Sequence, residues 1–142
     1  SFRVREEDEW LNWIDGNELA VYDLTQKIIS FNMNWFKGRK HEVRLKSQFV
    51  ALDAENPISL ISNPDGYLFN HTSDVKPFTQ GIASFQIRYK YEIAPLSYIY
   101  AVYTKGGRVY DDENERNTSK VFKDPWNNPD NEIFSLKFRL KF

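Results

Sequence analysis

The chain has 142 residues, a formal net charge of −1 and no cysteine. The length suits a single domain, and the lack of cysteine excludes disulfides, thiolate zinc sites and cysteine catalysis. The balanced charge provides no overall field for nucleic acid. Mean hydropathy is −0.62, and no apolar run approaches the roughly 18 residues of a membrane helix.

Residues 1–18 contain conflicting signals. Residues 2–5 could end a strand, the acidic cluster Glu6–Glu9 follows, and residues 15–17 read Asp-Gly-Asn, which signals a turn. We interpret this segment as a long loop with a strand stub at its start. A short amphipathic helix over about residues 6–14 is the alternative.

Residues 20–36 and 41–53 predict two strands joined by a tight turn at residues 37–40. Both strands alternate apolar and polar side chains, which indicates a sheet with two different faces. The apolar face holds Ile29, Phe31, Met33, Trp35, Val43, Leu45, Phe49 and Ala51. The opposite face holds Ser30, Asn32, Asn34, Arg44, Lys46 and Gln48.

Residues 54–79 contain repeated Asn-Pro, Asp-Gly and Lys-Pro turn chemistry, so we expect a long loop there. The third strand covers about residues 80–93 and places Arg88 and Lys90 opposite a row of apolar side chains. After a short turn at residues 94–97, residues 98–105 predict a fourth strand. Both faces of this strand are apolar, so its orientation stays open.

A second long loop is expected over about residues 106–131, and the last nine residues form the fifth predicted strand. These nine residues alternate without a single exception and end on an aromatic side chain. One face holds Phe134, Leu136, Phe138, Leu140 and Phe142, and the other holds Ser135, Lys137, Arg139 and Lys141.

Short and long connections alternate along the chain, as they do in outer-membrane barrels with short periplasmic turns and long external loops. The expected strands are about 10–14 residues long, enough for a tilted membrane crossing. We therefore predict an all-β, antiparallel up-and-down meander that forms the C-terminal portion of a transmembrane outer-membrane β-barrel, with residues 1–142 as one segment. In that arrangement the basic lumen face comprises Arg44, Lys46, Arg88, Lys90, Lys137 and Arg139, and the interfacial aromatics are Trp35, Phe36, Tyr91 and Tyr98.

Five or six strands are too few for a closed barrel, since the smallest use 8. An open sheet edge leaves backbone groups unpaired in hydrocarbon. We therefore expect the partners to be membrane lipid and either the remaining N-terminal barrel strands or other chains.

Two segments carry a resemblance to a known family. They read Phe85-Gln-Ile-Arg-Tyr-Lys-Tyr-Glu-Ile-Ala-Pro-Leu-Ser97 and Ala101-Val-Tyr-Thr-Lys-Gly-Gly107, and the hairpin over residues 34–46 fits the same family. Over roughly residues 19–142 the chain resembles the C-terminal domain of unknown function, a predicted barrel, of Gram-negative envelope proteins that also carry a family-9-type carbohydrate-binding domain. The resemblance implies an outer-membrane location and a terminal strand ending at Phe142 that is read by the barrel-assembly machinery. The carbohydrate-binding domain is absent here, so no glycan function is carried over, and the resemblance implies no catalytic residue.

The residues themselves predict no catalytic residue, metal site, cofactor or nucleic-acid partner. His41 and His71 lie far apart in the sequence, and nucleophile-elbow, Walker and Rossmann patterns are absent. The acidic clusters Glu6–Glu9 and Asp111–Glu115 could bind Ca²⁺ or could be solvated loop charges. The basic face could favour anions in a porin-like lumen, or Glu92 and carboxylates from missing strands could neutralise it.

The predicted function is therefore non-enzymatic: a channel, scaffold or anchor in the outer membrane of a Gram-negative bacterium. The alternative is a soluble antiparallel β module for ligand binding or adhesion. The two differ in the side chains that face the interior, because a soluble module would bury the apolar rows in a core.

Overall fold

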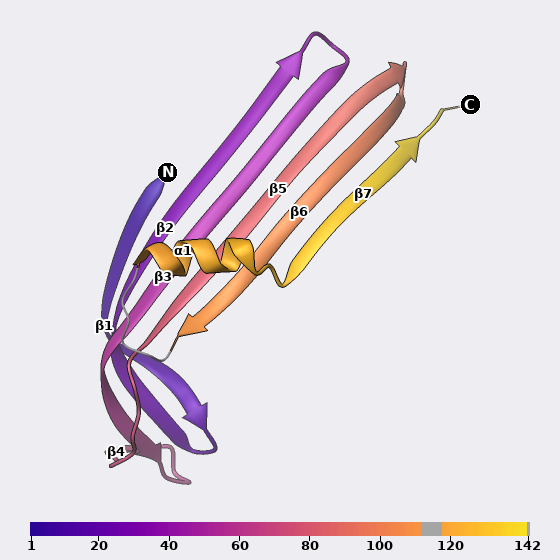
Figure 1. Ribbon diagram of the computed structural model, residues 1–142. Coiled ribbons are helices and arrows are strands. Elements are labelled where there is room, and N and C mark those ends of the chain that lie inside the picture. Colours follow the sequence, from indigo (N-terminus) through magenta and orange to yellow (C-terminus); the bar gives the residue numbers. More distant parts are fainter. Residues whose placement is uncertain (112–117, 142) are drawn as a thin grey trace.

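The computed structural model describes residues 1–111 and 118–141 of the chain (Figure 1). Strands dominate it, and one helix crosses the sheet. The strands are β1 (Phe2–Asp15), β2 (Glu18–Lys37), β3 (His41–Ser62), β4 (Leu68–Asn70), β5 (Phe78–Ala94), β6 (Ser97–Asp111) and β7 (Asn131–Arg139), and the helix is α1 (Thr118–Asn127).

The strands form one antiparallel meander in the order β1-β2-β3-β5-β6-β7, with the short β4 paired to β3. Each strand of the main path pairs with its neighbour along that path, so the connections run up and down. The sheet is open, with β1 and β7 at its two edges. The all-β class and the antiparallel meander expected from the sequence are confirmed.

The first 18 residues differ from expectation, because they form a full strand rather than a loop or a short helix. β1 pairs with β2 from Phe2 opposite Ile29 to Asp15 opposite Glu18. Gly16 makes the turn between them with a φ of 52°, a backbone conformation that glycine adopts readily. The charged residues of β1 hide its strand character, because a sheet edge tolerates polar side chains on both faces.

The predicted loop over residues 54–79 is also shorter than expected, since β3 continues to Ser62. Its Asn56-Pro57 pair lies at a register shift against β2, where the two residues oppose Tyr22 alone and β3 has one extra residue. Proline is accepted at such bulges, and a bulge increases the local bend of the strand. In Figure 1 the lower end of the sheet turns away from the direction of the straight upper part.

The second predicted loop, over residues 106–131, is replaced at both ends by regular structure. β6 continues to Asp111 and α1 occupies Thr118–Asn127, with Pro125 inside the helix. The facing of β6 is settled by its register, because Ala101 lies opposite Tyr89 and therefore shares its face.

A small hydrophobic core lies at the bent end of the sheet. Ala20, Tyr22, Leu24, Ala54 and Phe78 are buried there, and Trp10, Leu52 and Val75 pack against them. Leu24, Ala54 and Phe78 are directly opposite one another in the register, on the face that also carries Arg44 and Arg88. The long straight part of the sheet has no comparable core among the described residues.

Candidate functional site

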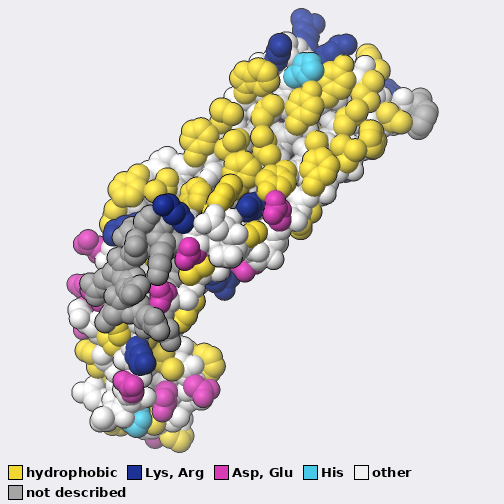
Figure 2. Space-filling view, in the orientation of Figure 1, with side chains coloured by type: hydrophobic (Ala, Val, Ile, Leu, Met, Phe, Trp, Pro, Cys, Tyr) yellow, Lys and Arg dark blue, Asp and Glu magenta, His cyan; other side chains and the backbone are white. Residues whose placement is uncertain are grey.

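One face of the straight sheet is almost entirely apolar. Residues opposite one another in the register share a face, so the pairings fix its membership. We call this surface the apolar band; it comprises Ile29, Phe31, Met33, Trp35, Val43, Leu45, Ser47, Phe49, Phe85, Ile87, Tyr89, Tyr91, Ile99, Ala101, Tyr103, Phe134, Leu136 and Phe138. Figure 2 shows it as a continuous field of hydrophobic side chains over the upper part of the molecule.

The apolar band is exposed. Trp35 is 48% exposed and Phe134 69% exposed, and every residue of β7 is exposed. Burying one large apolar side chain is worth about 1.5–3 kcal/mol, so a surface of this size is costly to leave in water. Contiguous exposed apolar surfaces larger than a few hundred Å² mark sites of contact with a protein or a membrane.

Charged side chains limit the apolar band at both ends. On its face of β2, the described residues between Lys27 and Lys37 include no charged side chain. The short-turn end carries the basic turn Lys37–Lys40, visible as a dark blue group in Figure 2. The other end has Lys105 opposite Glu132 on the neighbouring strand.

A polar aromatic cluster lies at the short-turn end. The His41 ring stacks on Tyr91 with 4.8 Å between centroids, and His41 Nδ1 lies 2.7 Å from the Tyr89 hydroxyl in a hydrogen bond. Trp35 lies in the same border zone of the band. Of the four predicted interfacial aromatics, Trp35 and Tyr91 share the apolar face, whereas Phe36 and Tyr98 lie on the opposite face by their register.

The opposite face of the sheet carries all six predicted basic lumen residues. Arg44 lies opposite Arg88. Lys90 lies between Glu42 on one neighbouring strand and Tyr100 on the other. Tyr100 lies opposite Lys137. The remaining members of the set, Lys46 and Arg139, have the same facing.

A carboxylate lies among these basic groups. Glu42 accepts a hydrogen bond from Arg44 Nε, and its second oxygen lies 3.6 Å from Lys90 Nζ. Lys90 Nζ also lies 4.5 Å from the centroid of the Tyr98 ring. Glu42 therefore neutralises part of the basic face. The sequence alternative assigned this role to Glu92 and to carboxylates of missing strands, and it did not include Glu42.

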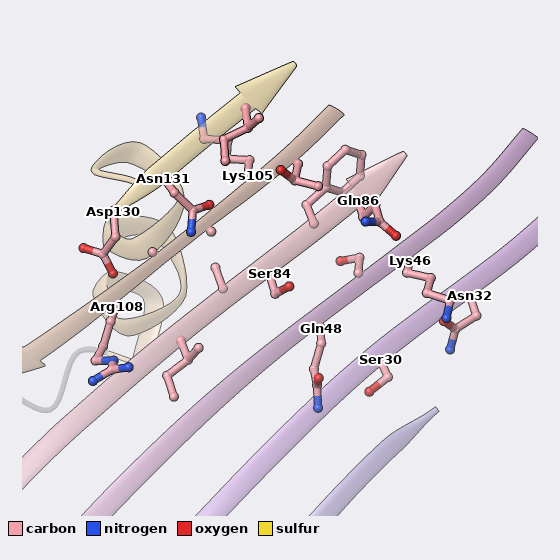
Figure 3. A pocket seen from close by; sticks show the side chains of 18 residues that line it. Ser30, Asn32, Lys46, Gln48, Ser84, Gln86, Lys105, Arg108, Asp130 and Asn131 are labelled. Atoms are coloured by element: carbon pink, nitrogen blue, oxygen red, sulfur yellow. The ribbon is translucent and has the colours of Figure 1, made fainter. Parts of the chain in front are cut away.

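A hollow of about 620 Å³ lies on this same polar face, nearer the middle of the sheet. Figure 3 views it from the side opposite the helix, with polar side chains projecting from the neighbouring strands. Most of the polar side chains on this face of the hollow are neutral, and the charged ones are Lys46, Arg108 and Asp130. The neutral polar groups on this face are Ser30, Asn32, Gln48, Ser84, Gln86, Thr104 and Asn131.

The small core closes the polar face at its bent end. The ring of Tyr22 lies 5.2 Å from that of Phe78 and 6.1 Å from that of Trp10. Phe78 in turn stacks on Tyr110 at 5.1 Å. Burial, together with the nearby Tyr110, raises the pKa of the Tyr22 hydroxyl above its ordinary value.

The helix α1 rests on the apolar face, next to the band. Val121 and Pro125 are buried, and Trp126 contacts Phe85 edge-on with 5.6 Å between ring centroids. The Asp-Pro and Asn-Pro pairs of this segment predict a loop, and the structure has a helix there instead. The spacing of Val121 with Pro125 and of Phe122 with Trp126 was the available signal, since residues four apart share one side of a helix.

The described residues contain no cluster of metal-binding side chains. No group of three His, Asp or Glu side chains could hold a metal ion within the ranges 1–111 and 118–141. Glu6–Glu9 lie in β1 at an irregularity, because the register against β2 shifts between Glu7 and Trp10 and Glu9 has a φ of 57°. The remaining acidic positions Asp112, Glu113 and Glu115 lie outside the described residues. No helix in the described part of the chain has the length and apolar character needed to cross a bilayer.

The terminal strand has the predicted alternation. Phe134, Leu136 and Phe138 belong to the apolar band, and Leu140 follows β7 and is 54% exposed. Phe142 lies outside the described residues. Comparison of the chain with models of protein families, with curated proteins and with solved structures finds no match. Any function proposed for this chain therefore depends on its own residues.

Proposed function

We propose that this chain is the C-terminal portion of an outer-membrane β-barrel, with the apolar band toward lipid and the basic face toward the lumen. The observation that carries the proposal is the band itself: an exposed apolar surface on one face of long antiparallel strands, limited by charges at both ends. Outer-membrane barrels alternate apolar and polar side chains in this way. A soluble module would instead cover the band with a second layer, and α1 covers only its border.

The size of the band fits this assignment. Lys27 and Lys37 are ten residues apart on β2, which is about 34 Å at roughly 3.4 Å per residue. A strand tilted by about 40° then spans a height of about 26 Å, close to the roughly 25 Å apolar band of such barrels. The basic turn at residues 37–40 would lie in the headgroup region, beside Trp35 and Tyr91 as interfacial aromatics.

The two free edges define the partners that the proposal requires. Backbone groups on the outer sides of β1 and β7 need hydrogen-bond partners in hydrocarbon. The remaining N-terminal strands, or other chains, supply them by closing the barrel. The C-terminal sequence, with Phe134, Leu136, Phe138, Leu140 and Phe142, acts as the signal that the barrel-assembly machinery recognises.

The proposal includes a relationship of residues 19–142 to the barrel domain of Gram-negative envelope proteins, which is inferred from the motifs at residues 85–97 and 101–107. The protein then works as a channel, a scaffold or an anchor in the outer membrane, without catalysis. Bound lipid is its main partner. The hollow on the polar face lies on the lumen wall.

The test compares Leu136→Arg with Ser135→Arg in the full chain. Leu136 lies in the apolar row of β7, whereas its neighbour Ser135 faces the other side. An arginine at mid-bilayer depth costs about 2–4 kcal/mol on the lipid face, so Leu136→Arg should reduce the membrane-inserted, protease-resistant fraction and Ser135→Arg should leave it intact. Equal yields for the two variants would reject the lipid-facing assignment.

A further inference from the structure

The helix α1 is positioned by two glycines of the sheet. A Cβ on Gly81 would lie 2.2 Å from the carbonyl oxygen of Val121, and a Cβ on Gly107 would lie 2.2 Å from that of Pro125. Only glycine allows the helix backbone to approach β5 and β6 this closely. The helix crosses β3, β5 and β6 on the face of the apolar band (Figure 1).

The helix has a distinct orientation with respect to the band. Val121 and Pro125 face the sheet, and at about 100° per residue Phe122 and Trp126 lie together on one flank. Phe122 packs on Phe49 at 6.4 Å, and Trp126 packs on Phe49 and Phe85. Phe49 and Phe85 are the band residues nearest the helix, so the aromatic flank of α1 faces the band.

The other sides of the helix are polar. Lys123 and Asn127 are exposed, and by the same angular spacing they lie on the side away from the sheet. Asp124 lies on the flank opposite the aromatic pair. The described part of α1 therefore has one flank suited to hydrocarbon and the rest suited to water or headgroups.

Charged and amphipathic side chains of β6 and β7 lie beside α1. Lys105 Nζ lies 4.9 Å from the centroid of the Trp126 ring. Glu132, opposite Lys105, accepts a hydrogen bond of 2.5 Å from the Tyr103 hydroxyl. Tryptophan, tyrosine and lysine with this mixture of apolar and polar contacts are typical of a membrane–water boundary.

From this arrangement we infer that α1 is an in-plane interfacial helix, which lies at headgroup level on the long-loop side and sets the depth of the barrel in the bilayer. The inference rests on the proposed barrel function and adds to it a second lipid contact. Its partner is the lipid surface. Phe122 and Trp126 meet the outer ends of the acyl chains, and Lys123 and Asn127 face the headgroups and water.

The test measures the depth of Trp126 in phosphatidylcholine vesicles. The full chain is prepared with Trp126 as its only tryptophan, or with Trp35 or Trp13 as its only one. The lipids carry bromine either near the headgroup or near the chain ends. Trp126 and Trp35 should each be quenched at least about twofold more by the shallow bromines, and Trp13, at the far turn, should not respond.

The outcomes separate the two proposals. Quenching of Trp35 without quenching of Trp126 would overturn the helix assignment and leave the barrel intact. Stronger quenching of Trp126 by deep bromines would also overturn it. No quenching of either residue would reject the barrel itself.

The neighbouring glycines Gly106 and Gly107 provide a variant and its matched control. Gly107→Ala should displace α1 and reduce the quenching of Trp126, while Trp35 keeps its response. Gly106→Ala lies next to it, and its Cβ would meet nothing closer than 3.4 Å, so Trp126 should behave as in the parent. Unchanged quenching in Gly107→Ala would contradict the docking of α1 through these glycines.

Discussion

Gly107 lies directly beneath Pro125, so close that a methyl group on the glycine would lie 2.2 Å from the proline carbonyl oxygen. On the neighbouring strand β5, Gly81 lies equally close to the carbonyl oxygen of Val121. The two contacts hold one short helix against an otherwise uncovered apolar face. Two small residues in the sheet thus decide where the exposed band ends.

The first prediction concerns the stability that this contact provides. Gly81→Ala should lower the free energy of unfolding by about 1–3 kcal/mol, because overpacking forces the backbone apart. Displacement of α1 would also uncover Phe49 and Phe85. Urea unfolding in lipid vesicles and protease cleavage after Lys123 would both report the change.

The matched variant is again Gly106→Ala, which should unfold at nearly the parent urea concentration. Combining Gly81→Ala with Gly107→Ala should cost less than the sum of the two single changes, because the first already releases the helix. Strict additivity would mean that the two glycines act on separate structures.

The central parts of the alternating strands could be predicted from the sequence, whereas β3 and β6 continue beyond their predicted ends to Ser62 and Asp111. Residues 41–53 and 80–93 were expected as strands and lie inside β3 and β5. The strict alternation of apolar and polar residues also determined which side chains share a face, because successive residues of a strand point to opposite faces. Both basic and apolar rows of β7 follow from the same rule.

β1, the bulge at Pro57 and the helix α1 could not be predicted from local sequence patterns. Over residues 5–9 β1 carries charged side chains without a break, and this interrupts the alternation on which strand prediction depends. Pro57 normally marks a turn, but a bulge accepts it. The helix depends on Gly81, which is 37 or more residues away from it in the chain, and single-sequence patterns do not reveal such a contact.

A second prediction concerns the bulge in β3. Asn56 has a φ of 49°, and its Nδ2 donates a 2.7 Å hydrogen bond to Asp23. Asn56→Ala should lower the free energy of unfolding by about 1–2 kcal/mol, because alanine is strained in the left-handed region. Asn56→Gly also loses the hydrogen bond but accepts this backbone conformation, so it should be the milder change. Thermal unfolding would rank them, and the reverse order would show that backbone strain is not the cause.

A third prediction follows from Glu42, which lies between Arg44 and Lys90. Glu42→Gln leaves these cations without their carboxylate and should lower the free energy of unfolding by about 1 kcal/mol at low salt. The loss should shrink as salt rises, because ions screen the remaining repulsion. Urea unfolding at low and high salt would measure it, with Asp65→Asn in an exposed turn as control. A loss that is independent of salt would indicate a packing effect instead.

The last prediction concerns pH and the buried Tyr22. Its pKa is raised in the folded state, so the neutral phenol is favoured by folding. The stability that this contributes is complete below the unfolded pKa of about 10 and is lost as pH rises through the higher folded value. Denaturant unfolding at a series of alkaline pH values should show this loss in the parent and a smaller loss in Tyr22→Phe. Tyr67→Phe removes an exposed tyrosine and is the control. An alkaline loss of the same size in Tyr22→Phe and in the parent would assign the transition to other groups.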